Sequence, residues 1–140
     1  MNYRPKYNKS PKLYNLKIGK VFLYEDYIIT EFDEGVDVNF KNFNEISKII
    51  EENFENRAFG FIANRVNSYS INLKDAKLFN EKFNNAIAYA IVAYSDLTKR
   101  IIEIENHFFK FNKQVFTTTD DAIAWVEEAL AHQYADSYNK

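Results

Sequence analysis

The sequence predicts an α/β fold: a mixed, mostly parallel sheet of about five strands that opens with an antiparallel hairpin and is covered by about four helices. Three observations lead to this prediction. Two short apolar runs, residues 58–63 and 86–94, are typical of strands buried on both faces. Segments with helical spacing alternate with these runs, and such alternation indicates parallel strands joined by right-handed crossovers. A pair of β-branched and aromatic segments near the N-terminus predicts the hairpin.

The hairpin is expected over residues 21–24 and 27–32, which are rich in β-branched and aromatic side chains. Glu25 and Asp26 separate the two strands. A second turn at residues 33–35 leads into a short extended run. We therefore place both hairpin strands at an antiparallel edge of the sheet.

The first helix is expected over residues 43–55. Asn42 stands three residues before Glu45, which is the spacing of a capping box, and apolar residues recur behind it with helical spacing. The strand at residues 58–63 follows, and a loop rich in Asn and Ser leads out of it.

The second helix is expected to begin after Asn72 and to end at Asn84 and Asn85. Its apolar face consists of three residues: Ala76, Phe79 and Phe83. The most apolar segment of the chain, residues 86–94, follows directly. We therefore place this strand in the middle of the sheet, beside the strand at 58–63.

The third helix has the strongest helical signal in the chain. Ser95 and Asp96 supply its cap, and apolar residues then follow in steps of four, three, four and three: Leu97, Ile101, Ile104, Phe108 and Phe111. This spacing predicts a single apolar face that shields the sheet from water.

A strand at residues 114–117 and a fourth helix complete the domain. Thr118 and Asp121 can cap this helix. Its predicted buried stripe is Ala122, Ile123, Val126, Ala129 and Leu130, with Trp125 at the edge of the core. The tail at residues 135–140 is expected to fray, so that one domain spans residues 13–134.

Residues 1–12 are expected to form a flexible basic arm, because Pro5 and Pro11 interrupt regular structure. Six of the 18 basic residues precede the first acid, Glu25, so the remainder of the chain is acidic. The candidate contact residues of the arm are Arg4, Lys6, Lys9 and Lys12. Interleaved tyrosines could stack on bases, and the arm could equally dock on a neighbouring subunit. We favour a solubilising role and do not expect nucleic acid as a partner.

Composition excludes several kinds of site. The chain of 140 residues has no cysteine and three glycines, so thiolate metal sites, disulfides and glycine-rich phosphate loops are ruled out. No G-x-S-x-G elbow and no third ligand beside the two histidines are present, so we expect no metal, no cofactor and no enzymatic activity. No run reaches the roughly twenty apolar residues of a membrane span, and no secretory signal is evident. We therefore expect a cytoplasmic protein.

The order of elements resembles the STAS/SpoIIAA-like domain family. Four segments carry this resemblance: the hairpin at residues 21–32 with Glu34 and Gly35, the strand and exit at 59–65, the strand at 88–92, and residues 115–117 leading into the helix at 121–126. The resemblance covers roughly residues 13–134 and rests on pattern more than on a diagnostic motif.

The resemblance implies a regulatory or scaffolding module that is not an enzyme and acts by binding another protein. In anti-sigma-factor antagonists of this fold, a Ser or Thr after a central strand, at the start of the next helix, is phosphorylated to switch partner binding. The corresponding loop gives the candidate contact residues Asn64, Arg65, Ser68 and Ser70, without the Asp-Ser-x-Gly-like context of that site. A phosphate there would be favoured at a helix N-terminus and would repel an acidic partner.

Three hypotheses of function follow. The leading one is a module that binds a protein partner or itself, as a homodimer for example. The alternative is a small apolar-ligand or lipid-binding domain, because 17% of the residues are aromatic and could line a pocket. The third is an enzyme, which would require Arg65, Glu31 and His107 to converge in one cleft.

Overall fold

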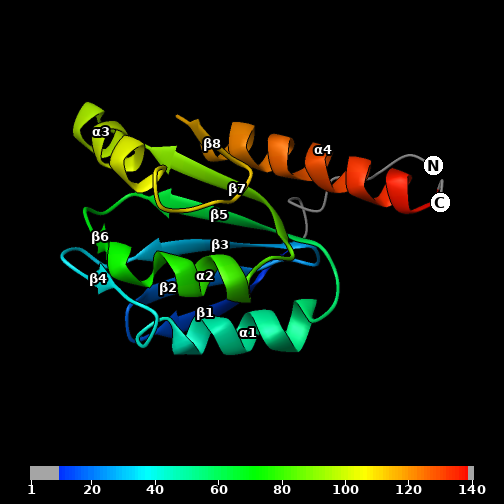
Figure 1. Cartoon of the computed structure of the whole chain (residues 1–140), viewed down its shortest axis with the longest axis horizontal. Coiled ribbons are helices and arrows are strands. Elements are labelled where there is room, and N and C mark those ends of the chain that lie inside the picture. Colours follow the sequence, from blue (N-terminus) through cyan, green and yellow to red (C-terminus); the bar gives the residue numbers. More distant parts are fainter. Residues whose placement is uncertain (1–9, 139–140) are drawn as a thin grey trace.

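A six-stranded mixed sheet forms the middle layer of the computed structural model, which describes residues 10–138 (Figure 1). In spatial order its strands are β1 (Lys12–Leu16), β2 (Gly19–Leu23), β3 (Tyr27–Phe32), β5 (Phe59–Arg65), β7 (Ala86–Ala93) and β8 (Lys113–Phe116). The first three strands pair antiparallel, and β3, β5, β7 and β8 pair parallel. The helices are α1 (Asn44–Phe54), α2 (Ala76–Lys82), α3 (Asp96–Glu105) and α4 (Thr119–Tyr138), with a short 3₁₀ turn η1 (Leu73–Asp75) before α2.

The predicted fold class is confirmed, with one more strand in the main sheet than expected. The additional strand is β1, whose residues pair with β2 from Lys12 to Leu16. Its five residues include Lys12 and Asn15 and are partly exposed, so they lack a continuous apolar run. The β1–β2 turn depends on Gly19, which has φ +147° and lies so near β3 that a Cβ would be 2.4 Å from the Glu31 carbonyl oxygen.

Two further short strands form a separate parallel pair. β4 (Asp37–Val38) pairs with β6 (Ser70–Ile71). The short extended run expected after residue 35 is thus a strand at Asp37–Val38 only, and its partner is the segment after β5 and not the main sheet. This pair fixes the loop between β5 and η1 against the loop that follows β3.

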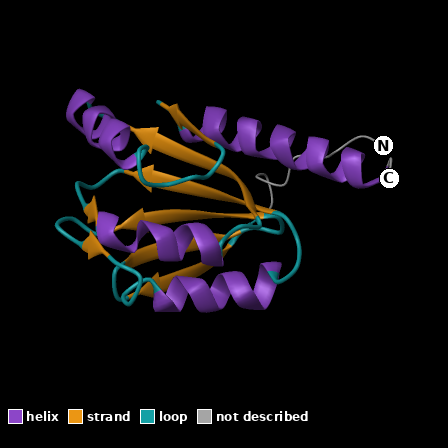
Figure 2. Cartoon of the chain, in the orientation of Figure 1, coloured by secondary structure: helices purple, strands orange, loops and turns teal. Residues whose placement is uncertain are grey.

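The two apolar strands lie side by side as expected. β5 pairs parallel with β7, in register from Gly60 opposite Ala88 to Arg65 opposite Ala93. Alternate side chains point to opposite faces of the sheet. One face packs against α1 and α2, and Figure 2 shows these two helices together in front of the strands. The other face packs against α4.

α4 buries its predicted stripe except for Ala129, which is half-buried. Ala122, Ile123, Val126 and Leu130 are buried against β3, β5 and β7. The approach is close, because a Cβ on Gly60 would lie 2.3 Å from the Val126 Cγ1. Trp125 is half-buried beside Phe116, at the edge of this layer. The helix continues to Tyr138, beyond residue 134, where the domain was expected to end.

The prediction for α3 is wrong in two respects. The helix ends at Glu105, and Leu97, Ile104 and Phe108 are exposed and do not shield the sheet. Only Ile102 and Glu105 of the helix are buried.

The expected basic arm lies mostly outside the described residues. Arg4, Lys6 and Lys9 fall in that part, whereas Lys12 is the first residue of β1 and places its Nζ 5.0 Å from the centre of the Tyr14 ring. Among the helices of residues 10–138, none combines the length and the apolar character that crossing a membrane requires.

Candidate functional site

The exposed apolar side of α3 is the most unusual surface of the described structure. Four residues form it, here called the α3 face: Leu97, Ile101, Ile104 and Phe108. The exposed fractions are 64% for Leu97, 57% for Ile104 and 43% for Phe108, and Ile101 is half-buried. The chain continues past Glu105 as a turn. The Asn106 N–H donates to the Ile102 carbonyl and the Phe109 N–H to the Glu105 carbonyl, as in an α-helix, whereas the His107 and Phe108 N–H groups make the tighter bonds of a 3₁₀ turn to Ile104 and Glu105. Phe108 lies on this turn, and its exposed side chain is counted with the α3 face.

The sequence sets the start of α3 firmly. The Ser95 side chain accepts a hydrogen bond of 3.1 Å from the Thr98 N–H, and Asp96 adds a negative charge in the first turn. Both satisfy or complement the free N–H groups at a helix N-terminus. Figure 1 shows α3 at a corner of the molecule, extending past the arrowhead of β7.

A buried ion pair sets the rotation of α3. Ile102 packs on Ile91 and Ala93 of β7, and Glu105 accepts a 2.7 Å hydrogen bond from the Arg65 Nη1 at the end of β5. At roughly 100° per residue, Ile102 and Glu105 share one side of the helix, and the α3 face lies about a quarter-turn away. The apolar side is therefore turned outward because a charged side chain occupies the inward position.

The ion pair is almost completely shielded from water. The Arg65 side chain is 2% exposed and the Glu105 side chain 7%. Burial lowers the pKa of Arg65, but the nearby Tyr69 and Glu105 outweigh this effect and the pKa is raised. Burial raises the pKa of Glu105, and Arg65 offsets only part of that shift. The 2.7 Å contact is that of a charge-assisted hydrogen bond.

Arg65 also organises the loop that follows β5. Its Nη2 donates to the Tyr69 carbonyl at 3.0 Å, and the guanidinium lies 4.4 Å from the centre of the Tyr69 ring. Burial raises the pKa of Tyr69 and of Tyr89. Of the four loop residues singled out in the sequence, Arg65 is therefore a structural anchor that holds β5, the loop and α3 together.

The remaining loop residues point to different neighbours. The Asn64 Nδ2 donates to Glu31 at 2.9 Å, and its Oδ1 accepts from the Tyr94 hydroxyl at 2.6 Å. The Ser68 N–H donates to Glu34 at 2.7 Å, and the Ser70 hydroxyl donates to Asp37 at 2.7 Å.

The two serines are exposed, but neither begins a helix. Ser70 lies in β6, and the cap of η1 is Asn72, whose side chain accepts from the Lys74 N–H. A phosphate on either serine would stand beside the carboxylate of Glu34 or Asp37, and not at free helix N–H groups.

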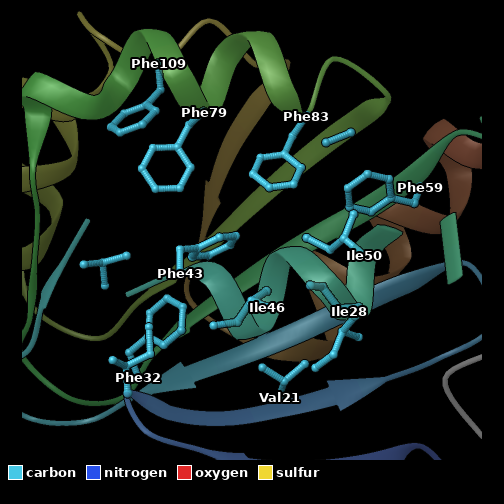
Figure 3. Packing of buried hydrophobic residues seen from close by; sticks show 14 of the residues in the cluster. Val21, Ile28, Phe32, Phe43, Ile46, Ile50, Phe59, Phe79, Phe83 and Phe109 are labelled. Carbon is cyan, nitrogen blue, oxygen red and sulfur yellow. The ribbon is translucent and has the colours of Figure 1, made fainter. Parts of the chain in front are cut away.

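Beneath α2 lies a small aromatic cavity. Its volume is about 70 Å³. Ten of its fourteen lining residues are aromatic, and none is charged. Figure 3 shows Phe43, Phe79, Phe83 and Phe109 gathered under this helix. Edge-to-face contacts, such as that between Phe43 and Phe79 at 5.2 Å, hold the rings together. The aromatic residues of the sequence therefore largely fill the core on this side.

The second hollow and the three polar residues of the enzyme hypothesis do not come together in one site. A groove of about 280 Å³ lies between the ends of α1 and α2 and includes Glu51 and Lys82, which form an ion pair of 2.6 Å. Arg65 and Glu31 lie on opposite faces of the sheet, and His107 is exposed after α3. Within residues 10–138, no group of three or more His, Asp or Glu side chains is arranged to hold a metal ion.

Comparison with known proteins supports the architecture. Neither a protein-family model nor a curated protein matches the sequence. The crystal structure of an uncharacterised DUF3478-family protein from Shewanella loihica PV-4, described as having a SpoIIAA-like fold, is similar to the chain. The TM-score is 0.53 at 13% identity, over 84% of this chain and 92% of that chain. The chain has a SpoIIAA-like fold. The predicted resemblance is thus confirmed for the fold alone.

Sequence reasoning identified every residue of the α3 face but placed it on the wrong side of the helix. A signal was present, because the charged Arg65 follows the apolar run at residues 58–63, and the acidic Glu105 lies among the apolar residues of the predicted third helix. Pairing these two residues would have rotated the helix correctly.

Proposed function

We propose that this SpoIIAA-like domain acts by binding another protein, and that the α3 face is the surface through which it binds. The observation that carries the proposal is the exposure of Leu97, Ile104 and Phe108 on α3 and the turn that follows it. Contiguous exposed apolar side chains on a folded domain mark interaction sites more often than isolated ones do. A helix face of this kind suits a partner that covers it with apolar side chains of its own.

The energetic basis is the burial of apolar surface. Each large apolar side chain gains about 25 cal/mol per Å² of surface removed from water. The face is carried by a capped helix whose rotation is fixed by Arg65 and Glu105, so little conformational freedom is lost on binding.

The cavities support this proposal over the ligand-binding alternative. Small-molecule sites usually enclose about 300–1,000 Å³. The aromatic cavity has about 70 Å³, and the larger groove, at about 280 Å³, is lined mainly by polar residues. A lipid chain would not fit the aromatic cavity without opening the packed rings of α1 and α2.

The polar residues near the α3 face support binding over catalysis. Arg65 and Glu105 neutralise each other, and Asn64 is engaged on both sides by Glu31 and Tyr94. These buried groups hold the scaffold in place, and none of the three lines the aromatic cavity or the larger groove.

Photo-crosslinking tests the proposal directly. A photoreactive amino acid replaces Leu97 in the full chain, and a matched control carries it at Leu78, which is 45% exposed on α2. We expect adducts with a defined protein from position 97 and not from position 78. The identified protein, once purified, should bind the domain at least tenfold more weakly when Ile104→Glu is introduced. Equal adducts at both positions, no adduct, or binding unaffected by Ile104→Glu would contradict the proposal.

A further inference from the structure

We infer that the protein bound by the α3 face is a second copy of this chain, with the two α3 helices packed antiparallel about a two-fold axis. This inference rests on the proposed function and names its partner. It follows from two independent patterns on α3, one apolar and one charged.

The apolar pattern is symmetric along the helix. Its members are separated by four, three and four residues, so the spacing is the same from either end: Leu97, Ile101, Ile104 and Phe108. An antiparallel pair with its axis between residues 102 and 103 places Leu97 opposite Phe108 of the second copy. The same axis places Ile101 opposite Ile104 of the second copy. Every apolar side chain of the face then meets another one.

The charged pattern changes sign when the helix is reversed about the same axis, so that acidic positions come to lie near basic ones. Each residue of the α3 face follows a charged or ionisable one, and these neighbours form one flank: Asp96, Arg100, Glu103 and His107. All four are exposed, and none of their side chains takes part in an ion pair within the described residues. Asp96, Arg100 and Glu103 share one side of the helix at roughly 100° per residue, and His107 lies on the turn that follows it.

Reversal of the helix brings opposite charges together. Arg100 then lies within about 3 Å, measured along the helix axis, of the level of Glu103 of the second copy. Asp96 is offset equally from His107 of the second copy, whose imidazole N–H can donate a hydrogen bond to the carboxylate. A parallel two-fold pair would instead place the two copies of this flank on opposite sides of the contact, so that these charges would not meet. The charges therefore favour the antiparallel two-fold, in which each contact occurs twice.

The position of α3 leaves it accessible to a second domain. It projects at a corner of the molecule beyond the strand ends (Figure 1). Exposed Tyr94, immediately before the helix, can widen the contact.

A charge exchange tests the partner. By sedimentation equilibrium of the full chain across a range of concentrations, we expect dimers, and we expect monomers for Ile104→Glu. Arg100→Glu and Glu103→Arg should each weaken self-association at least tenfold, because like charges then face each other. A mixture of these two variants should form a heterodimer with near wild-type affinity, since each of the two contacts again joins an acid and a base, one of them with the signs exchanged. Leu78→Glu on α2 is the matched control and should leave the dimer intact.

Crosslinking by cysteine tests the orientation, because the chain has no cysteine of its own. Chains with Leu97→Cys mixed with chains with Phe108→Cys should form a mixed disulfide on mild oxidation. Leu97→Cys alone should crosslink poorly, since its two copies would be about 16 Å apart along the axis. Preferential self-crosslinking of Leu97→Cys would overturn the antiparallel arrangement.

The results separate the inference from the proposed function. A wild-type chain that stays monomeric at millimolar concentration overturns the second copy as partner, and so does a dimer that neither Ile104→Glu nor the charge exchange affects. If photo-crosslinking at position 97 then identifies a different protein, the binding function stands and only the inference falls. If it identifies none, both fall.

Discussion

α3 and α4 use the same kind of amphipathic sequence in opposite ways. α4 buries Ala122, Ile123, Val126 and Leu130 against one face of the sheet. By contrast, α3 and the turn after it leave Leu97, Ile104 and Phe108 exposed. The apolar spacing of α3 is the more regular of the two. The difference shows that periodicity locates a helix, while the strongest inward contact sets its rotation. In α3 that contact is polar.

Removal of the polar contact should have the largest effect. Glu105→Gln leaves the buried Arg65 without a counter-charge, and we expect a loss of about 3–5 kcal/mol in the free energy of unfolding. Urea denaturation in dilute protein measures it. The control is Glu81→Gln, which breaks the exposed Lys77–Glu81 pair of 4.0 Å and should cost less than about 0.5 kcal/mol. Similar losses in both variants would mean that Arg65 and Glu105 do not hold α3.

The next largest difference is expected between two leucine substitutions, one on each helix. Leu130→Ala removes a fully buried side chain of α4, and we expect it to lower the free energy of unfolding by about 2–4 kcal/mol. Leu97→Ala on α3 should change it by less than about 0.5 kcal/mol, because that side chain is exposed. A large loss from Leu97→Ala in the monomer would show that α3 packs inward.

The close approach of α4 to β5 gives a smaller effect. Gly60→Ala places a methyl group against Val126, and we expect a loss of about 1–3 kcal/mol from overpacking. The double variant Gly60→Ala/Val126→Ala frees the space, so it should be more stable than the sum of the single effects predicts. Strict additivity of the two changes would argue against this contact. Thermal or urea denaturation of the four proteins completes the cycle.

The cap of α3 should have the smallest effect. Ser95→Ala removes the acceptor of the Thr98 N–H, and we expect a loss of about 1 kcal/mol. Amide hydrogen exchange should quicken in the first turn of α3 while α4 stays protected. Unchanged exchange at Thr98 would show that the side chain of Ser95 does not cap the helix.

Much of the fold could be predicted from local patterns. The apolar strands at 59–65 and 86–93, the four helices and the buried stripe of α4 all follow from periodicity and capping residues. β1 could not be predicted from such patterns. It is a five-residue edge strand that contains Lys12 and Asn15, and nothing in its sequence distinguishes it from a polar arm. The β4–β6 pair depends on contacts between segments about thirty residues apart, which local patterns do not encode.

The candidate site was predicted only in its composition. Periodicity grouped Leu97, Ile101, Ile104 and Phe108, but it assigns an apolar face to the interior by default. The outward rotation depends on a pair forty residues apart in the sequence, Arg65 and Glu105, which no local window contains. Ser68 and Ser70 were singled out by position, and their hydrogen bonds to Glu34 and Asp37 follow from the tertiary fold alone.

The most direct test of the rotation of α3 uses two isoleucines of the same helix. Ile102 is 1% exposed and Ile104 is 57% exposed, and the chain has no cysteine to interfere. Ile104→Cys and Ile102→Cys are each reacted with a thiol reagent in dilute, folded protein. The structure predicts that Ile104→Cys reacts at nearly the rate of a free peptide thiol and that Ile102→Cys reacts at least a hundredfold more slowly. Equal protection of both thiols, or the reverse order, would contradict an outward-facing α3.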